Sequence, residues 1–81
     1  QLKAQLGLRA GMSALDIGTG LGTIARGLAA MGLQVTGVDP SEAMLAEARE
    51  VAAADGLAIR FMAGRAEALD LDDASVDLVV A

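Results

Sequence analysis

The sequence contains no cysteine, histidine, asparagine, tryptophan or tyrosine among its 81 residues, and these absences narrow its possible chemistry. Without cysteine there is no disulfide and no thiolate metal site. Without histidine the chain lacks the commonest metal ligand and the commonest general base. Phe61 is the only aromatic residue, so a core has to be built from aliphatic side chains and methionine. Such a restricted composition fits a GC-rich genome as well as a reconstructed or designed sequence.

Basic residues are scarce, since six of them stand against eleven acidic residues and give a net charge of −5. This charge disfavours non-specific binding to nucleic acid or to an anionic membrane. No apolar run approaches the ~20 residues needed to span a bilayer, and the first residues do not have the layout of a signal peptide. We therefore expect a cytoplasmic protein that binds neither nucleic acid nor membrane.

Short apolar runs alternate with amphipathic segments along the chain. The runs are typical of buried parallel strands and lie at residues 14–17, 33–39, 57–64 and 76–81. Helical periodicity is present at residues 1–8, 22–31 and 39–56. This alternation predicts right-handed crossovers between parallel strands. We expect an α/β fold in one domain of 81 residues. It is a partial doubly wound (Rossmann-like) parallel sheet with strand order 3-2-1-4 and helices on both faces, truncated after the fourth strand.

Two of the predicted helices have recognisable ends and buried stripes. In the first, Ile24, Leu28 and Met31 recur at helical spacing and predict the buried side. The second begins at Asp39 or Ser41, either of which can cap it. Its predicted apolar stripe comprises Met44, Leu45, Ala48, Val51 and Ala52.

Three alternating glycines follow the first predicted strand: Gly18, Gly20 and Gly22 in the segment LDIGTGLGTIA. In an open α/β sheet this position, at the carboxyl end of a strand, is where ligands bind. The phosphate-binding loop of nucleoside triphosphatases does not fit, because Ile24 stands where its lysine is required. The dinucleotide fingerprint fits only in part, because Thr23 occupies its last position. The glycines predict a ligand loop without identifying the ligand.

Two aspartates narrow the class of ligand. Asp39 ends the second predicted strand about twenty residues after the loop. A carboxylate at this position accepts hydrogen bonds from both hydroxyls of an adenosine ribose and repels a 2′-phosphate. Asp16 lies just before the first glycine. A carboxylate there is unfavourable beside a pyrophosphate and favourable beside an ammonium and a sulfonium. An adenosine ligand with positive charge and no phosphate is S-adenosylmethionine (SAM), which we expect as the cofactor.

Three motifs in order resemble those of class I SAM-dependent methyltransferases. The segments LDIGTGLGTIA and VTGVDPSEAMLAEARE are similar to the first two motifs, and FMAGRAEALDLDDASVDLVVA is similar to the third motif and the following strand. The resemblance implies that Asp16 faces the methionine amino group of SAM or S-adenosylhomocysteine and that Asp39 holds the ribose. The cofactor-binding residues that it implies are Asp16, Gly18, Thr19, Gly20, Gly22, Asp39, Pro40, Ser41, Met44, Ala66 and Glu67.

One position departs from the family pattern. Arg65 stands where many relatives have an aspartate that bonds the adenine amino group, and a guanidinium offers no acceptor. Residues that hold the methyl acceptor normally lie beyond the fourth strand, so no catalytic residue is assigned and the isolated chain is expected to be inactive. A second hypothesis is a non-enzymatic minimal domain, truncated, reconstructed or designed, that folds and self-associates. An NAD-binding oxidoreductase domain is a third.

The fourth predicted strand lies at an edge of the sheet by topology. Its apolar residues are Val76, Leu78, Val79 and Val80. Asp77 is its only charged residue, and an apolar edge strand is a template for pairing with another chain. We expect a homodimer joined through this strand or by exchange of an element. No metal site is expected, since nothing fixes the geometry of the acidic run within residues 70–73.

Overall fold

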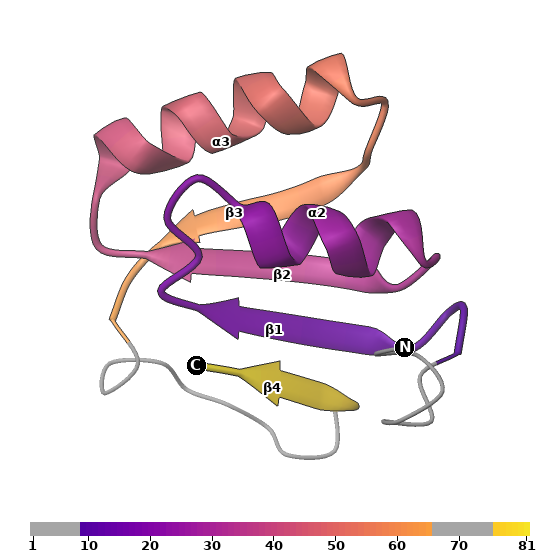
Figure 1. Ribbon diagram of the computed structural model, residues 1–81. Coiled ribbons are helices and arrows are strands. Elements are labelled where there is room, and N and C mark those ends of the chain that lie inside the picture. Colours follow the sequence, from indigo (N-terminus) through magenta and orange to yellow (C-terminus); the bar gives the residue numbers. More distant parts are fainter. Residues whose placement is uncertain (1–8, 66–75) are drawn as a thin grey trace.

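The protein is described by a computed structural model that covers residues 9–65 and 76–81 (Figure 1). Four strands form one parallel sheet: β1 (Ser13–Ile17), β2 (Gln34–Asp39), β3 (Ile59–Ala63) and β4 (Leu78–Val80). Two helices connect the first three strands: α2 (Thr23–Ala30) and α3 (Glu42–Ala54). The strands lie in the order β3-β2-β1-β4, which confirms the predicted parallel α/β fold and its strand order.

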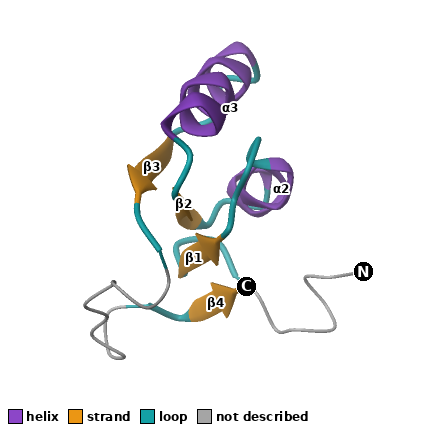
Figure 2. Ribbon diagram, turned by 90° about the vertical axis from the view of Figure 1, so that its left-hand side faces the viewer, coloured by secondary structure: helices purple, strands orange, loops and turns teal. Residues whose placement is uncertain are grey.

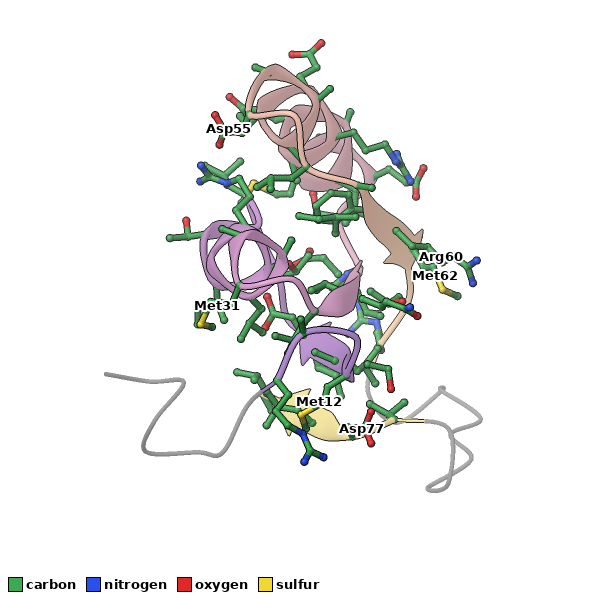
Figure 3. All side chains as sticks on the ribbon, turned by 90° about the vertical axis from the view of Figure 1, so that its right-hand side faces the viewer. Met12, Met31, Asp55, Arg60, Met62 and Asp77 are labelled. Carbon is green, nitrogen blue, oxygen red and sulfur yellow. The ribbon has the colours of Figure 1, made fainter. Side chains whose placement is uncertain are left out.

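Helices α2 and α3 cover the same face of the sheet (Figure 2). Because the chain steps from β1 to β2 and from β2 to β3 in the same direction, right-handed crossovers place both helices on one side. Arg60 and Met62 of β3 point away from the helices, on the second face (Figure 3). No helix covers that second face within the part of the chain that the structure describes. The predicted helix at 1–8 and the connection at 66–75 lie outside that part.

The hydrophobic core lies between the sheet and the two helices. Its buried residues are Ala14, Ala25, Leu28, Leu33, Val35, Leu45, Ala48, Ala52 and Phe61. The predicted stripe of α3 is confirmed at Leu45, Ala48 and Ala52, which are its buried residues. Alanine at these contact positions lets the helix approach the strands closely, and the one aromatic ring fills the space beneath.

The predicted stripe of α2 is wrong at one position. Ile24 is 52% exposed, whereas Ala25 and Leu28 are buried. Gly22 is the N-cap of the helix and faces the ring of Phe61, so the buried side continues from Gly22 at helical spacing through Ala25 and Leu28. The packing of Gly22 against Phe61 therefore determines how α2 is rotated about its axis. The apolar periodicity of the helix did not predict this rotation.

Strand β4 is the edge strand that the sequence predicted, and Asp77 holds its amino end. Oδ2 of Asp77 accepts hydrogen bonds from the Ser13 N–H at 2.8 Å and from the Ser13 hydroxyl at 3.2 Å. The Asp77 N–H donates to the Ser13 carbonyl at 3.0 Å. At the opposite edge, Nη2 of Arg49 donates to the Phe61 carbonyl of β3 at 3.1 Å. Asp77 thus joins β4 to β1 and is turned toward the sheet.

Candidate functional site

The glycine loop, residues 18–22, connects β1 to α2 at the carboxyl end of the sheet (Figure 1). Both Gly18 and Thr19 donate their N–H groups to the Val38 carbonyl, at 2.8 and 2.9 Å. The Gly22 N–H donates to the Thr19 carbonyl at 2.8 Å, which closes the loop before the helix begins. The loop is therefore anchored to the end of β2, beside Asp39.

Asp39 ties this loop to the start of α3. Its Oδ2 accepts from the Gly20 N–H at 2.9 Å and its Oδ1 accepts from the Ser41 N–H at 2.9 Å. The Ser41 hydroxyl accepts from the Met44 N–H at 3.2 Å, so Ser41 caps α3 and Asp39 does not. Each carboxylate oxygen has a second lone pair. Asp39 is half-buried and can still accept hydrogen bonds from the hydroxyls of a ligand.

The three glycines of the loop face different surroundings. Among the described residues, a Cβ atom on Gly18 would have no neighbour within 4 Å, and one on Gly20 would meet only the Met44 methyl, at 3.6 Å. A Cβ atom on Gly22 would instead stand 3.2 Å from the ring of Phe61. The backbone φ angles of Gly18 and Gly20 are +76° and +55°, values that residues with a side chain rarely adopt. Gly18 and Gly20 thus leave open space at the loop, whereas Gly22 makes room for the core.

Two polar side chains are buried beneath this loop. Asp16 is 4% exposed and Thr19 is 7% exposed. Among the described residues, Thr19 Oγ1 has no hydrogen-bond partner, and none of the hydrogen bonds found there ends on the Asp16 carboxylate. An unpaired buried polar group costs about 1–3 kcal/mol, so most such groups have partners. Both side chains have oxygen atoms that can accept hydrogen bonds from a ligand.

The backbone register places these two groups close together. Asp16 is paired with Gly37 of β2 and shares the helix-covered face with Ala14, two residues earlier. Thr19 Oγ1 would stand 2.8 Å from a Cβ atom on the same Gly37. A buried carboxylate and a buried hydroxyl therefore gather at the carboxyl ends of β1 and β2, which suits a cationic donor group.

Exposed apolar side chains lie beside the polar groups. Met44 is 37% exposed and its methyl lies near Gly20, so it contacts the loop and is not part of the core stripe predicted for α3. Leu21 of the loop is 40% exposed. Leu21 is not among the predicted site residues, and its only signal in the sequence is its place between two of the loop glycines. These side chains offer apolar surface to a planar base.

The structure brings most of the predicted site residues to one end of the sheet. Those residues are Asp16, Gly18, Thr19, Gly20, Asp39, Pro40, Ser41 and Met44. Gly22 is turned into the core, and Ala66 and Glu67 lie outside the described residues. The exposed Arg65 follows Gly64, whose N–H donates to the Asp39 carbonyl at 3.1 Å. The position that departs from the family pattern is therefore next to the candidate site.

Other features of the molecule do not compete with this site. A groove of about 760 Å³ opens at the amino ends of β2 and β3, and its described lining includes none of the predicted site residues. Within residues 9–65 and 76–81, no three side chains are grouped so as to hold a metal ion. No helix in those ranges is long and apolar enough to cross a membrane. Two buried side-chain atoms of the described residues lack a hydrogen-bond partner: Thr19 Oγ1, at the carboxyl end of the sheet, and Arg26 Nε, in α2.

The chain is similar to known methyltransferases in sequence. Residues 14–81 match a family model described as a methyltransferase domain. A ubiquinone biosynthesis O-methyltransferase of Methylocella silvestris is 38% identical over 71 residues, which cover 88% of this chain and 28% of that protein. The chain thus spans little more than a quarter of the length of this curated relative.

Solved structures share the fold. The YcgJ protein from Bacillus subtilis superposes with a TM-score of 0.86 at 31% identity, over 96% of this chain and 34% of its own. The Haemonchus contortus phosphoethanolamine N-methyltransferase 2, solved with phosphomonomethylethanolamine and S-adenosylhomocysteine, gives a TM-score of 0.84 at 38% identity. That match covers 96% of this chain and 19% of the larger protein.

Proposed function

Because this chain belongs to the SAM-dependent methyltransferase family, as its match to the methyltransferase domain over residues 14–81 shows, we propose that it is the cofactor-binding part of a methyltransferase. Its cofactor is SAM, and S-adenosylhomocysteine is the corresponding product. The proposed site lies at the carboxyl ends of β1 and β2. The observation that carries the proposal is the pair of buried acceptors, Asp16 and Thr19, beneath a glycine loop that Asp39 fastens to α3.

The adenosine half of the cofactor fits the groups around Asp39. Its carboxylate uses one lone pair on each oxygen for Gly20 and Ser41, and the remaining lone pairs suit two neighbouring ribose hydroxyls. Met44 is exposed beside the loop and provides apolar surface for the adenine. Pro40 and Ser41 continue the same edge toward α3. The open space at Gly18 and Gly20 lets the cofactor approach the backbone.

The methionine half fits the buried polar pair. The ammonium of SAM is a strong donor, and it can donate to the Asp16 carboxylate and to Thr19 Oγ1, which has no hydrogen-bond partner among the described residues. The negative charge of Asp16 also favours the nearby sulfonium. When bound, SAM supplies an electrophilic methyl group on sulfur, and the residues of this chain hold and orient it. No residue here is assigned to the methyl acceptor, and the activity of a longer protein is part of the proposal.

The loop backbone argues against the dinucleotide hypothesis. A pyrophosphate is bound by free N–H groups of a glycine loop. Here the N–H groups of Gly18, Thr19 and Gly20 already donate to the Val38 carbonyl and to Asp39. The buried Asp16 would also repel the phosphates. The hypothesis of a minimal domain without enzymatic activity has no comparable observation in its favour.

Parallel calorimetric titrations of the chain with SAM, S-adenosylhomocysteine and NAD test this function. We expect both adenosyl ligands to bind in preference to NAD. SAM should lose more affinity than S-adenosylhomocysteine in Asp16→Asn, because only SAM carries the sulfonium charge. Equal or tighter binding of NAD, or no binding of either adenosyl ligand, would contradict the proposal. Transfer of labelled methyl to common small acceptors should stay at the level of the buffer blank.

Two further parts of the proposal concern the whole molecule. We expect a cytoplasmic protein, and we expect a homodimer that pairs through β4 or exchanges an element. The dimer is supported by the position of β4 at the edge of the sheet and by Val79, which is 51% exposed. A closed two-fold contact between β4 strands would pair the free edges of both chains.

A further inference from the structure

Phe61, the only aromatic residue of the chain, occupies space that two glycines leave free. It is 7% exposed and stands on the helix-covered face of β3, paired with Gly37 of β2. A Cβ atom on Gly37 would lie 2.9 and 3.0 Å from Cδ1 and Cε1 of the ring. A Cβ atom on Gly22 would lie 3.2 and 3.3 Å from Cζ and Cε1. One ring is thus held between a strand and the N-cap of α2.

The same contacts continue from the ring to the glycine loop. A Cβ atom on Gly37 would also stand 2.8 Å from Thr19 Oγ1, closer than such atoms approach each other. The Gly22 N–H donates to the Thr19 carbonyl at 2.8 Å. One continuous packed group, which we call the ring stack, consists of Phe61, Gly37, Gly22 and Thr19. It reaches from β3, across β2, to the underside of the loop.

The ring stack lies at the end of the loop that has no hydrogen bond to β2 among the described residues. The N–H groups of Gly18, Thr19 and Gly20 donate to the Val38 carbonyl and to Asp39, both at the end of β2, and the Gly22 carbonyl accepts from the Arg26 N–H of α2 at 2.8 Å. The other end of the loop, at Gly22, rests on the ring of Phe61. The carbonyl of Phe61 accepts from Arg49 at 3.1 Å, which fixes the backbone of β3 at this point. Because protein interiors are close-packed, a change of volume at the ring displaces the loop.

We propose that Phe61 is a positioning residue for cofactor binding: its ring, seated on Gly37 and Gly22, sets the height of the glycine loop above the sheet. The inference rests on the proposed function. Phe61 acts from the core, through the loop backbone at Gly18 and Gly20. A residue that only filled the core would change the stability of the fold and leave the affinity of the folded protein unchanged.

The test is calorimetric titration of S-adenosylhomocysteine into the chain and its variants, well below each melting temperature. Gly37→Ala adds a methyl group against the ring and Thr19, and we expect it to raise Kd about tenfold. Two matched controls should stay within about twofold of the parent. Gly27→Ala adds the same methyl group where no atom lies within 4 Å. Val35→Ala weakens the core on the same face of β2, away from the loop.

A double variant separates positioning from simple loss of stability. In Gly37→Ala with Phe61→Leu, the smaller side chain relieves the contacts of the added methyl group with the ring, while its contact with Thr19 Oγ1 remains. We expect Kd to return toward the parent value, below that of Gly37→Ala alone. The inference is overturned if both Gly37→Ala and Phe61→Leu bind with the parental affinity. It is also overturned if Val35→Ala loses as much affinity as those two variants. If Gly37→Ala does not fold, Phe61→Leu and the double variant decide.

The parent chain distinguishes the two proposals. If it does not bind S-adenosylhomocysteine, the proposed function has failed and the positioning role fails with it. If it binds and the ring-stack variants bind equally well, only the positioning role is wrong.

Discussion

Two aspartates tie elements together at opposite ends of the sheet. Asp39, at the carboxyl end of β2, accepts one hydrogen bond on each oxygen, from the N–H groups of Gly20 and Ser41. Asp77, just before β4, accepts two hydrogen bonds from Ser13 on a single oxygen. Both carboxylates therefore join segments that are distant in sequence, and their own bonds do not distinguish a binding residue from a structural one.

The surroundings of the two aspartates make the distinction. Around Asp39 there is open space at Gly18, the buried side chain of Asp16, and the buried Thr19 Oγ1, which has no partner among the described residues. Asp77 is exposed, and Ser13, to which it bonds, begins the register of β1. At the carboxyl end, Thr19 Oγ1 remains without a partner among the described residues. At the amino end, the Asp77 carboxylate is bonded to Ser13 and joins β4 to β1. Substitutions at the two ends should therefore affect different properties.

The largest effect should come from filling the open space at the carboxyl end. Gly20→Val places a β-branched side chain at a φ of +55° and into the space beside the Met44 methyl. We expect loss of measurable binding of S-adenosylhomocysteine by calorimetry, because strain and bulk both displace the loop. Gly27→Val, in α2 with open space around it, is the matched control and should keep binding. Parental affinity in Gly20→Val would reduce the loop to a simple turn.

Removing the carboxylate of Asp39 or of Asp77 tests whether the two ends of the sheet have different roles. Asp39→Ala should weaken S-adenosylhomocysteine binding by about 1–3 kcal/mol, the scale of charge-assisted hydrogen bonds to ligand hydroxyls. Asp77→Ala should leave the dissociation constant unchanged and lower the free energy of unfolding by about 1–2 kcal/mol, because the two hydrogen bonds from Ser13 to Asp77 Oδ2 are lost. Calorimetry and thermal unfolding of both variants give the two quantities. An equal loss of affinity in the two variants would remove the distinction between the ends.

Asp16 should respond with opposite signs in stability and affinity. Asp16→Asn removes the charge of a residue that is 4% exposed, so the ligand-free chain should become more stable by about 1 kcal/mol. The same change should weaken SAM binding about tenfold, because the acceptor for a cation is lost. Thermal unfolding without ligand and titration with SAM measure the two effects. A loss of stability together with unchanged affinity would make Asp16 a structural residue.

The smallest expected effect concerns the edge of β4. Val79 is 51% exposed, so Val79→Lys should shift the mass measured by sedimentation from dimer to monomer with little change in cofactor affinity. A lysine at Met62, which is 44% exposed on the second face of β3, controls for added charge away from that edge. A parent chain that is a stable monomer at micromolar concentration contradicts the dimer.

Much of this architecture was determined by local features of the sequence. The short apolar runs and the amphipathic segment after Asp39 predicted the strands and helices, and the glycines placed the loop, because periodicity and turn residues act within a few neighbours. The predicted strand order followed from the handedness of parallel crossovers in a doubly wound sheet. Asp39 and Asp16 were found as acidic residues beside that loop, where α/β sheets bind ligands.

Only the tertiary structure decided how these elements face one another. Ile24 is exposed although its spacing predicted burial, since the contact of Gly22 with Phe61 sets the rotation of α2. Gly37 carried no signal in the sequence, and its role depends on a ring from β3 and a hydroxyl from the loop. The direction of a side chain depends on register and packing between residues far apart in the chain. No local pattern contains that information.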